Sequence, residues 1–313
     1  MTWAILGSGF GLYGYLPAVW ARPNDEIVLL SRYRDQFERR PELARFADKI
    51  SWELDDDAAV ERSTGLILSR RPGDNRDAVH RYIGAEHVKN VVIEKPICST
   101  PSEAIQVQER LQASRAVFRI GYTFRYTYWA KSLLQGILVG AEVLPFFIEW
   151  RFMAHHFRNG QASWKTDPGE GGGVIRFYGI QLIALLAELG YNDVTHSVVR
   201  NSCGSTWEAT FVAAGLPNFA VLVDARSEES RFRVGTLALR NTDDCNVTVI
   251  QQRGPFETLD STTQILDPRV PLLEQLLDSF AGQRLESWYP AVNRLWAAVE
   301  RVTIHAKALK VLK

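Results

Sequence analysis

The chain has 313 residues, of which 46% are hydrophobic and 11% aromatic, so it can bury the cores of two domains of about 120 and 190 residues. Its 36 basic and 36 acidic side chains cancel, which argues against a nucleic acid or a membrane surface as the partner. The three cysteines are widely spaced and predict no metal site. We expect a cytoplasmic protein, because the first residues already enter a strand and no apolar run approaches the roughly 20 residues of a membrane span.

The first third of the chain alternates short apolar runs with helical segments. Strands are expected near residues 2–6, 26–31, 65–69, 89–93 and 117–120, and helices near 11–21, 34–47, 73–84 and 101–114. This alternation predicts a doubly wound parallel sheet, a Rossmann domain over residues 1–120.

A glycine-rich segment follows the first expected strand. Counted from Gly7, the dinucleotide fingerprint has Leu12 where its third glycine should stand, and counted from Gly9 it is complete but begins late. By either count the backbone N–H groups at a helix N-terminus favour a pyrophosphate, although a glycine-rich turn without a ligand is the alternative. The expected cofactor contacts in this segment are Gly7, Gly9, Phe10, Gly11 and Leu12.

The end of the second expected strand bears on which nucleotide binds. NAD-binding units usually carry an acidic residue there, which holds the ribose 2′-hydroxyl. This chain has Ser31 and Arg32 instead, and a guanidinium binds a phosphate bidentately. The strand end therefore favours NADP(H) over NAD(H), with an ordinary surface role for Arg32 as the alternative.

A second candidate site lies in Glu94-Lys95-Pro96-Ile97, directly after the apolar run at 91–93. Open α/β sheets bind their ligands at the carboxyl ends of the strands, where Lys95 is expected. Pro96 cannot donate to a ladder, so it ends the strand and restricts the backbone beside Lys95.

The second half of the chain predicts a different architecture. Helices are expected at 125–138, 174–189, 271–280 and 290–309, a long loop at 154–173, and strands at 143–152, 206–214, 218–225, 231–240 and 245–252. Short turns between the strands indicate mostly antiparallel pairing, so residues 121–313 should form an α+β domain with an open sheet. We expect a homodimer or homotetramer through this sheet, and the C-terminal helix could pack back on the first domain.

The chain resembles the Gfo/Idh/MocA oxidoreductases, which include glucose–fructose oxidoreductase, inositol dehydrogenase and biliverdin reductase. The resemblance spans nearly the whole chain. It rests on Gly7-Ser8-Gly9 with Leu16-Pro17-Ala18, Pro72, Glu94-Lys95-Pro96-Ile97 with Thr100 and Glu103-Ala104, Gly121-Tyr122 with Arg125-Tyr126, and Trp164-Lys165 before Gly171-Gly172-Gly173. It implies that Lys95 lies near the nicotinamide and the substrate oxygen. Further cofactor contacts are then expected at Arg71, Pro72, Glu94, Lys95 and Pro96.

The chain departs from this family on the expected helix at 174–189. Members usually carry an Asp and, four residues later, a His, where this chain has Phe177 and Gln181. Phe cannot exchange a proton and Gln cannot titrate, so the usual acid/base pair is missing. The catalytic candidates are Lys95, Tyr178, Gln181 and His156. Tyr122 and Tyr126 compete with Tyr178 as proton donors, and each aromatic could instead be a core residue.

Substrate contacts are expected at Tyr122, Arg125, Trp164, Lys165 and Gln181. The sequence thus predicts an NAD(P)-dependent oxidoreductase that reduces a carbonyl or imine of a sugar-like or specialised-metabolite substrate, with Lys95 as proton donor or electrostatic stabiliser. The alternative is a catalytically degenerate relative that serves as a cofactor-binding accessory or regulatory protein, because both the Asp and the His are absent.

Overall fold

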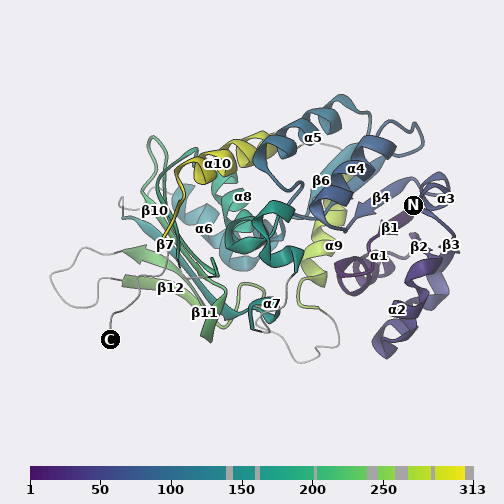
Figure 1. Ribbon diagram of the computed structural model, residues 1–313, viewed down its shortest axis with the longest axis horizontal. Coiled ribbons are helices and arrows are strands. Elements are labelled where there is room, and N and C mark those ends of the chain that lie inside the picture. Colours follow the sequence, from purple (N-terminus) through teal and green to yellow (C-terminus); the bar gives the residue numbers. More distant parts are fainter. Residues whose placement is uncertain are drawn as a thin grey trace. The chain divides into compact units, whose positions relative to one another are not determined.

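The computed structural model describes residues 1–138, 144–158, 163–200, 203–237, 246–257, 267–282 and 286–306. The chain divides into two compact units, each with its own sheet (Figure 1). The first comprises Met1–Cys98, Glu103–Tyr126 and the described part of Thr258–Ser287. The second comprises Ser99–Ser102 and the described parts of Thr127–Glu257 and Trp288–Lys313.

The first unit is built on a six-stranded parallel sheet in the order β3-β2-β1-β4-β5-β6. The strands are β1 (Thr2–Leu6), β2 (Glu26–Leu30), β3 (Ile50–Glu53), β4 (Gly65–Leu68), β5 (Asn90–Ile93) and β6 (Val117–Ile120). Central strands such as β4 are buried along their whole length, as apolar runs covered on both faces should be. This strand order confirms the predicted Rossmann-type sheet.

Short helices connect these strands. They are α1 (Leu16–Trp20) after a π-helical turn at Gly11–Tyr15, α2 (Arg34–Glu38), α3 (Asp56–Glu61), α4 (Pro72–Tyr82) and α5 (Pro101–Ala113), with 3₁₀ turns at Ser31–Tyr33, Pro41–Lys49 and Thr123–Tyr126. Strand β3 and helix α3 were not predicted from the sequence. Strand β3 has no fully buried residue, so it lacks the apolar run of its neighbours. Helix α3 starts because the Asp55 carboxylate accepts from the Ala58 N–H at 2.9 Å.

Helix α9 (Val270–Asp278), followed by a 3₁₀ turn at Ser279–Gly282, belongs to the first unit although it comes late in the chain. It packs against α1 (Figure 1). Arg119 of β6 is 1% exposed and holds the end of α9, donating to the Ser279 hydroxyl at 2.8 Å and to the Ser279 carbonyl at 2.7 Å.

The second unit contains a seven-stranded sheet in the order β12-β11-β7-β10-β9-β8-β13. Its strands are β7 (Phe146–Met153), β8 (Asp193–Arg200), β9 (Thr206–Val212), β10 (Phe219–Asp224), β11 (Arg226–Leu237), β12 (Asn246–Gln252) and β13 (Ile304–His305). Four of the strand pairs are antiparallel, whereas β7 pairs with β10 and β8 with β13 in parallel. The predicted mostly antiparallel sheet is confirmed. Strand β8, which lies between β9 and the edge strand β13, was not predicted, because its burial does not alternate.

Helices α6 (Tyr128–Leu138) and α7 (His155–Arg158), a π-helical turn at Val174–Gly179, α8 (Ile180–Glu188) and α10 (Tyr289–Val302) complete the second unit. Helices α8 and α10 pack on each other (Figure 1). Helix α10 also packs on β8. The expected final helix was too long. It ends at Val302, Thr303 turns to extended backbone, and Ile304 pairs with Val198 of β8.

The expected loop at 154–173 holds α7 and two 3₁₀ turns, Trp164–Thr166 and Pro168–Glu170, within its described residues. Cys245 and the residues 238–240 and 307–309 of two expected elements lie outside the described residues. Within the described part of the chain, none of the helices has the length and hydrophobicity needed to span a bilayer.

Candidate functional site

The glycine loop after β1 is packed on its inner side and open at Gly9. Gly7 has φ 153°, and a Cβ there would lie 2.1 Å from the Ser69 carbonyl oxygen, so only glycine fits. A Cβ on Gly11 would lie 3.0 Å from Ile5 Cγ2, and one on Gly14 would overlap the Phe10 ring. A Cβ on Gly9 would meet no atom within 4 Å, which leaves that edge of the loop open to a ligand.

A buried hydroxyl lies next to this loop. Ser69 follows β4 and is 8% exposed, and its Oγ makes no hydrogen bond among the described residues. A Cβ built on Gly11 would be 3.9 Å from this oxygen, so the hydroxyl lies beside the loop. Buried polar groups are normally satisfied, and a polar ligand on the loop would supply the missing partner. Loop and hydroxyl together fit the phosphates and ribose of a dinucleotide.

The Glu94-Lys95-Pro96 segment follows β5, and its Lys95–Pro96 peptide is cis. The Tyr15 hydroxyl donates to Glu94 Oε2 at 2.7 Å, and a Cβ on Gly121 would lie 2.6 Å from the same oxygen. Burial raises the pKa of Glu94, while the charge of Lys95 and the Tyr15 hydrogen bond oppose that rise. Glu94, the residue before Lys95, is therefore held by Tyr15 and lies close to Gly121.

Arg269, one residue before α9, also reaches the glycine loop. Its guanidinium lies 4.0 Å above the centroid of the Phe10 ring, and it forms an ion pair with Asp267 at 2.7 Å. Because Asp267 neutralises this guanidinium, Arg269 packs on the aromatic ring of the loop without adding net charge to it. Arg269 was not predicted as a neighbour of this loop, because nothing in its local sequence relates it to residues so far away in the chain.

At the end of β2, the Arg32 guanidinium contacts Asp56 through Nη2 and Oδ1 at 2.7 Å. Asp56 also accepts two hydrogen bonds from Arg70, each of 2.6 Å. Burial alone would raise the pKa of Asp56, but the hydrogen bonds from Arg70 and the charges of Arg70 and Arg32 lower it. Of the other predicted cofactor residues nearby in sequence, Ser31 is half-buried and Arg71 is exposed. Pro72 is buried and is the first residue of α4.

In the second unit, four predicted site residues gather around Phe177. The Tyr178 hydroxyl and His156 Nε2 are 2.9 Å apart, and the two rings are nearly parallel. The rings of Trp164 and His156 pack edge-to-face with the ring of Phe177, with centroid separations of 5.4 and 5.6 Å. Lys165 Nζ lies 5.7 Å from the centroid of the Phe177 ring. Short α7, the 3₁₀ turn at 164–166 and the π-helical turn position this cluster, whose members are all half-buried.

The other predicted residues lie elsewhere. Gln181 is on α8 and 5% exposed. Tyr122 and Arg125 belong to the first unit, where Tyr122 is 2% exposed and Arg125 pairs with Glu286 at 2.9 Å. The predicted substrate residues are thus divided between the two units.

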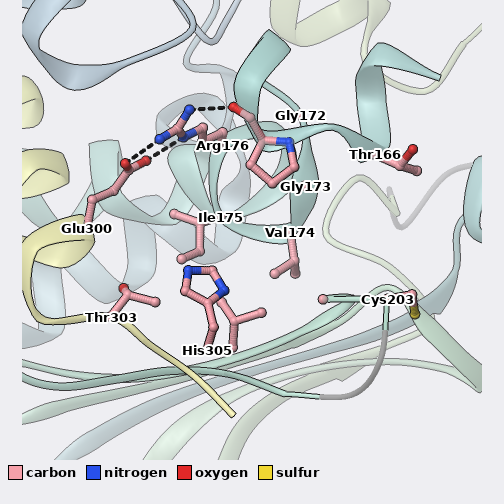
Figure 2. A pocket seen from close by; sticks show the side chains of 13 residues that line it. Thr166, Gly172, Gly173, Val174, Ile175, Arg176, Cys203, Glu300, Thr303 and His305 are labelled. Atoms are coloured by element: carbon pink, nitrogen blue, oxygen red, sulfur yellow. Dashed lines mark hydrogen bonds and ion pairs between the residues drawn. The ribbon is translucent and has the colours of Figure 1, made fainter. Parts of the chain in front are cut away.

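The second unit also has a cavity of about 150 Å³ that contains none of the predicted site residues (Figure 2). Gly172–Arg176 and the end of α10 line it, and Arg176 there binds Glu300 through two hydrogen bonds of 2.5 and 2.6 Å. Cys203 lies at its edge, with Arg226 Nη1 3.4 Å from the sulfur. Burial would raise the pKa of this thiol, but the Ser205 hydroxyl and Arg226 lower it. No group of three or more possible metal ligands occurs among the described residues.

The sequence matches no protein-family model and no curated protein. KijD10, a 3-ketoreductase from Actinomadura kijaniata in complex with NADP and TDP-benzene, is 15% identical, with 99% of each chain covered and a TM-score of 0.70. The chain therefore shares the two-domain α/β fold of this protein. A levoglucosan dehydrogenase with NADH and levoglucosan is 13% identical, covering 97% of this chain and 98% of its own, with a TM-score of 0.69. The WlbA dehydrogenase from Thermus thermophilus with NAD and UDP-GlcNAcA is 12% identical, covering 99% and 97%, with a TM-score of 0.69.

Proposed function

We propose that the protein is an NAD(P)-dependent oxidoreductase that prefers NADP(H) and reduces a carbonyl or imine of a sugar-like or specialised-metabolite substrate. The observation that carries this proposal is the glycine loop, which is closed inward at Gly7, open at Gly9 and flanked by the buried hydroxyl of Ser69. Such a loop at a helix start, after the first strand of a sheet ordered 3-2-1-4-5-6, suits a dinucleotide pyrophosphate.

The substrate class rests on the solved structures of similar fold. They include a 3-ketoreductase with TDP-benzene, a dehydrogenase with levoglucosan and a dehydrogenase with UDP-GlcNAcA, and the last two ligands are sugar derivatives. In the second unit, the flat rings of Trp164 and Phe177 offer apolar surfaces of the kind on which a sugar ring can rest. The preference for NADP(H) rests on Ser31 and Arg32 at the end of β2, since a guanidinium suits the extra phosphate.

In this proposal, side chains of the protein stabilise the negative charge that develops on the substrate and donate a proton. A bound reduced nicotinamide would supply a hydride to the carbonyl carbon. The ammonium of Lys95 would stabilise the negative charge that develops on the oxygen, an effect worth about 3–4 kcal/mol for a well-placed donor. The second unit holds its own proton-donating pair, in which the Tyr178 hydroxyl could donate a proton and recover it from His156, because their O and N atoms are 2.9 Å apart.

One observation favours the alternative of a degenerate, cofactor-binding accessory protein. Phe177, at the position where the resembled family carries an Asp, is packed by aromatic rings on several sides. An aromatic cluster therefore occupies the position at which the resembled family carries a carboxylate.

Titration of the purified protein with NADPH and NADH, followed by a panel of keto-sugars, nucleotide-linked keto-sugars and imines, tests the proposal. We expect micromolar or tighter binding of NADPH and consumption of NADPH with at least one member of the panel. Failure to bind either nucleotide would contradict the proposal. Tight binding with no turnover on the whole panel would favour the accessory protein.

A further inference from the structure

The proposed preference for NADP(H) needs more than Arg32, because an acidic side chain lies directly against that arginine. We propose that Arg70 decides the choice between NADP(H) and NAD(H) by neutralising Asp56 beside the 2′-phosphate. This inference rests on the proposed nucleotide-binding function and concerns a residue outside the glycine loop and the β2 strand end.

The three side chains come from the carboxyl ends of different strands of the first unit. Arg32 follows β2, Asp56 opens α3 after β3, and Arg70 comes two residues after β4. Arg70 binds Asp56 as a fork, Nη1 to Oδ2 and Nη2 to Oδ1, both at 2.6 Å, while Arg32 makes one contact of 2.7 Å. Ligands of open α/β sheets bind along this edge, so the ribose is expected beside Arg32. Asp56, the ion-pair partner of Arg32, is then close to the ribose as well.

Without Arg70, the Asp56 carboxylate would cancel the charge of Arg32 and repel a 2′-phosphate. A carboxylate at this place would instead accept a hydrogen bond from a 2′-hydroxyl, which is how acidic residues select NAD. With Arg70 present, the two guanidinium groups and one carboxylate carry a net charge of +1. The lowered pKa of Asp56, which burial opposes, agrees with an ionised carboxylate in this cluster.

Arg70 is held in this role by its surroundings. Its backbone N–H donates to Asn75 Oδ1 at 3.0 Å, and Asn75 is 1% exposed. Its guanidinium reaches the Tyr33 hydroxyl at 3.5 Å, and its side chain is 16% exposed against 52% for Arg32. Arg70 therefore stays paired with Asp56, whereas Arg32 is more exposed to solvent and can contact the nucleotide.

The test compares dissociation constants for NADPH and NADH by isothermal titration in the full-length protein and in Arg70→Met, Asp56→Asn and the double variant. In Arg70→Met we expect the ratio of NADPH to NADH affinity to fall about tenfold or more, the size of one charge-assisted contact, with the loss in NADPH binding. The double variant should recover the ratio, because the repelling carboxylate is gone. Arg81→Met, which loses an ion pair with the adjacent Asp57, is the matched control and should leave the ratio unchanged.

An equal loss of affinity for both nucleotides in Arg70→Met, or no recovery in the double variant, would mean that the pair only supports the fold, and would overturn the inference. If circular dichroism shows that Arg70→Met is unfolded, the inference is tested by Asp56→Asn alone. The ratio of NADPH to NADH affinity should then be higher in Asp56→Asn than in the unmutated protein, and an unchanged or lower ratio overturns the inference. Failure of the unmutated protein to bind either nucleotide is a different result, since it rejects the proposed function itself.

Discussion

At the scale of single residues, Lys95 is the side chain on which the proposed chemistry most depends. Lys95→Met should lower turnover about 100-fold or more, because a positive charge is lost where an oxyanion develops. Nucleotide affinity should change little. Gln181→Ala should cost less, since a buried Gln can only position a substrate. The measurement is kcat on the substrate found in the panel, with Lys89→Met, an exposed lysine just before β5, as the control. Undiminished turnover in Lys95→Met would reject the assigned role.

The Tyr178–His156 pair gives a second prediction at this scale. Tyr178→Phe removes the hydroxyl and keeps the aromatic packing, so kcat should fall about 100-fold, the usual effect of losing a general acid, without a change in nucleotide affinity. His156→Gln should cost less, because Tyr178 keeps its proton. Tyr128→Phe, at an exposed tyrosine of the same unit, is the control. A Tyr178→Phe enzyme with the same kcat and pH–rate profile as the unmutated protein would assign the proton to another group.

At the scale of elements, the connection between β6 and the end of α9 depends on a buried arginine. Arg119 donates to both the hydroxyl and the carbonyl of Ser279 and lies 5.0 Å from the centroid of Phe280. Arg119→Met leaves these acceptors without a donor, so we expect the free energy of unfolding to fall by about 2–3 kcal/mol in urea titrations. Arg115→Met, whose side chain is 92% exposed, should change it by less than about 0.5 kcal/mol. Equal effects in the two variants would contradict this account.

At the scale of the whole molecule, paired carboxylates set the acid limit of stability. Burial would raise the pKa values of Asp25, Asp56 and Glu149, but their ion-pair and hydrogen-bond partners lower all three pKa values below those of ordinary carboxyl groups. A depressed pKa adds stability that is present above the unfolded-state pKa and is lost as the pH falls through the folded-state pKa. Glu94 acts in the opposite sense, since burial raises its pKa.

We therefore expect the free energy of unfolding to fall below about pH 4 in urea titrations between pH 3 and 7. Asp25→Asn removes the N-terminal ammonium contact of 2.9 Å and should flatten this dependence. An unchanged slope in that variant would show that other groups control the acid transition.

Assembly is the second prediction for the whole molecule. In β10 and β9, buried residues alternate with half-buried ones, so one face of the sheet stays partly exposed. This face carries Val212, Ala220 and Leu222 among polar side chains such as Glu208 and Thr210. We propose that this face joins copies of the chain into a homodimer or homotetramer. Light scattering at micromolar concentration should give at least twice the mass of one chain, and a monomeric mass would reject the proposal.

Local sequence was sufficient for the features that a few neighbouring residues encode. Strands β1, β2, β4, β5 and β6 were predicted because a strand buried on both faces is a continuous apolar run with turn residues beside it. The glycine loop and Glu94-Lys95-Pro96 were recognisable for a similar reason, since a tight turn and a strand end impose their own residue types. Strand β3 lacked such a signal because it is only half-buried.

The tertiary structure alone decided which side chains meet. The contacts between Arg269 and Phe10, between Arg70, Asp56 and Arg32, and between His156 and Tyr178 join residues from separate elements. Local periodicity predicts which face of an element is buried, but the strand order and the path of each loop determine what that face contacts. From local sequence alone, a charged residue is therefore predicted to lie on the surface. Only the folded chain shows that Arg70 contacts Asp56.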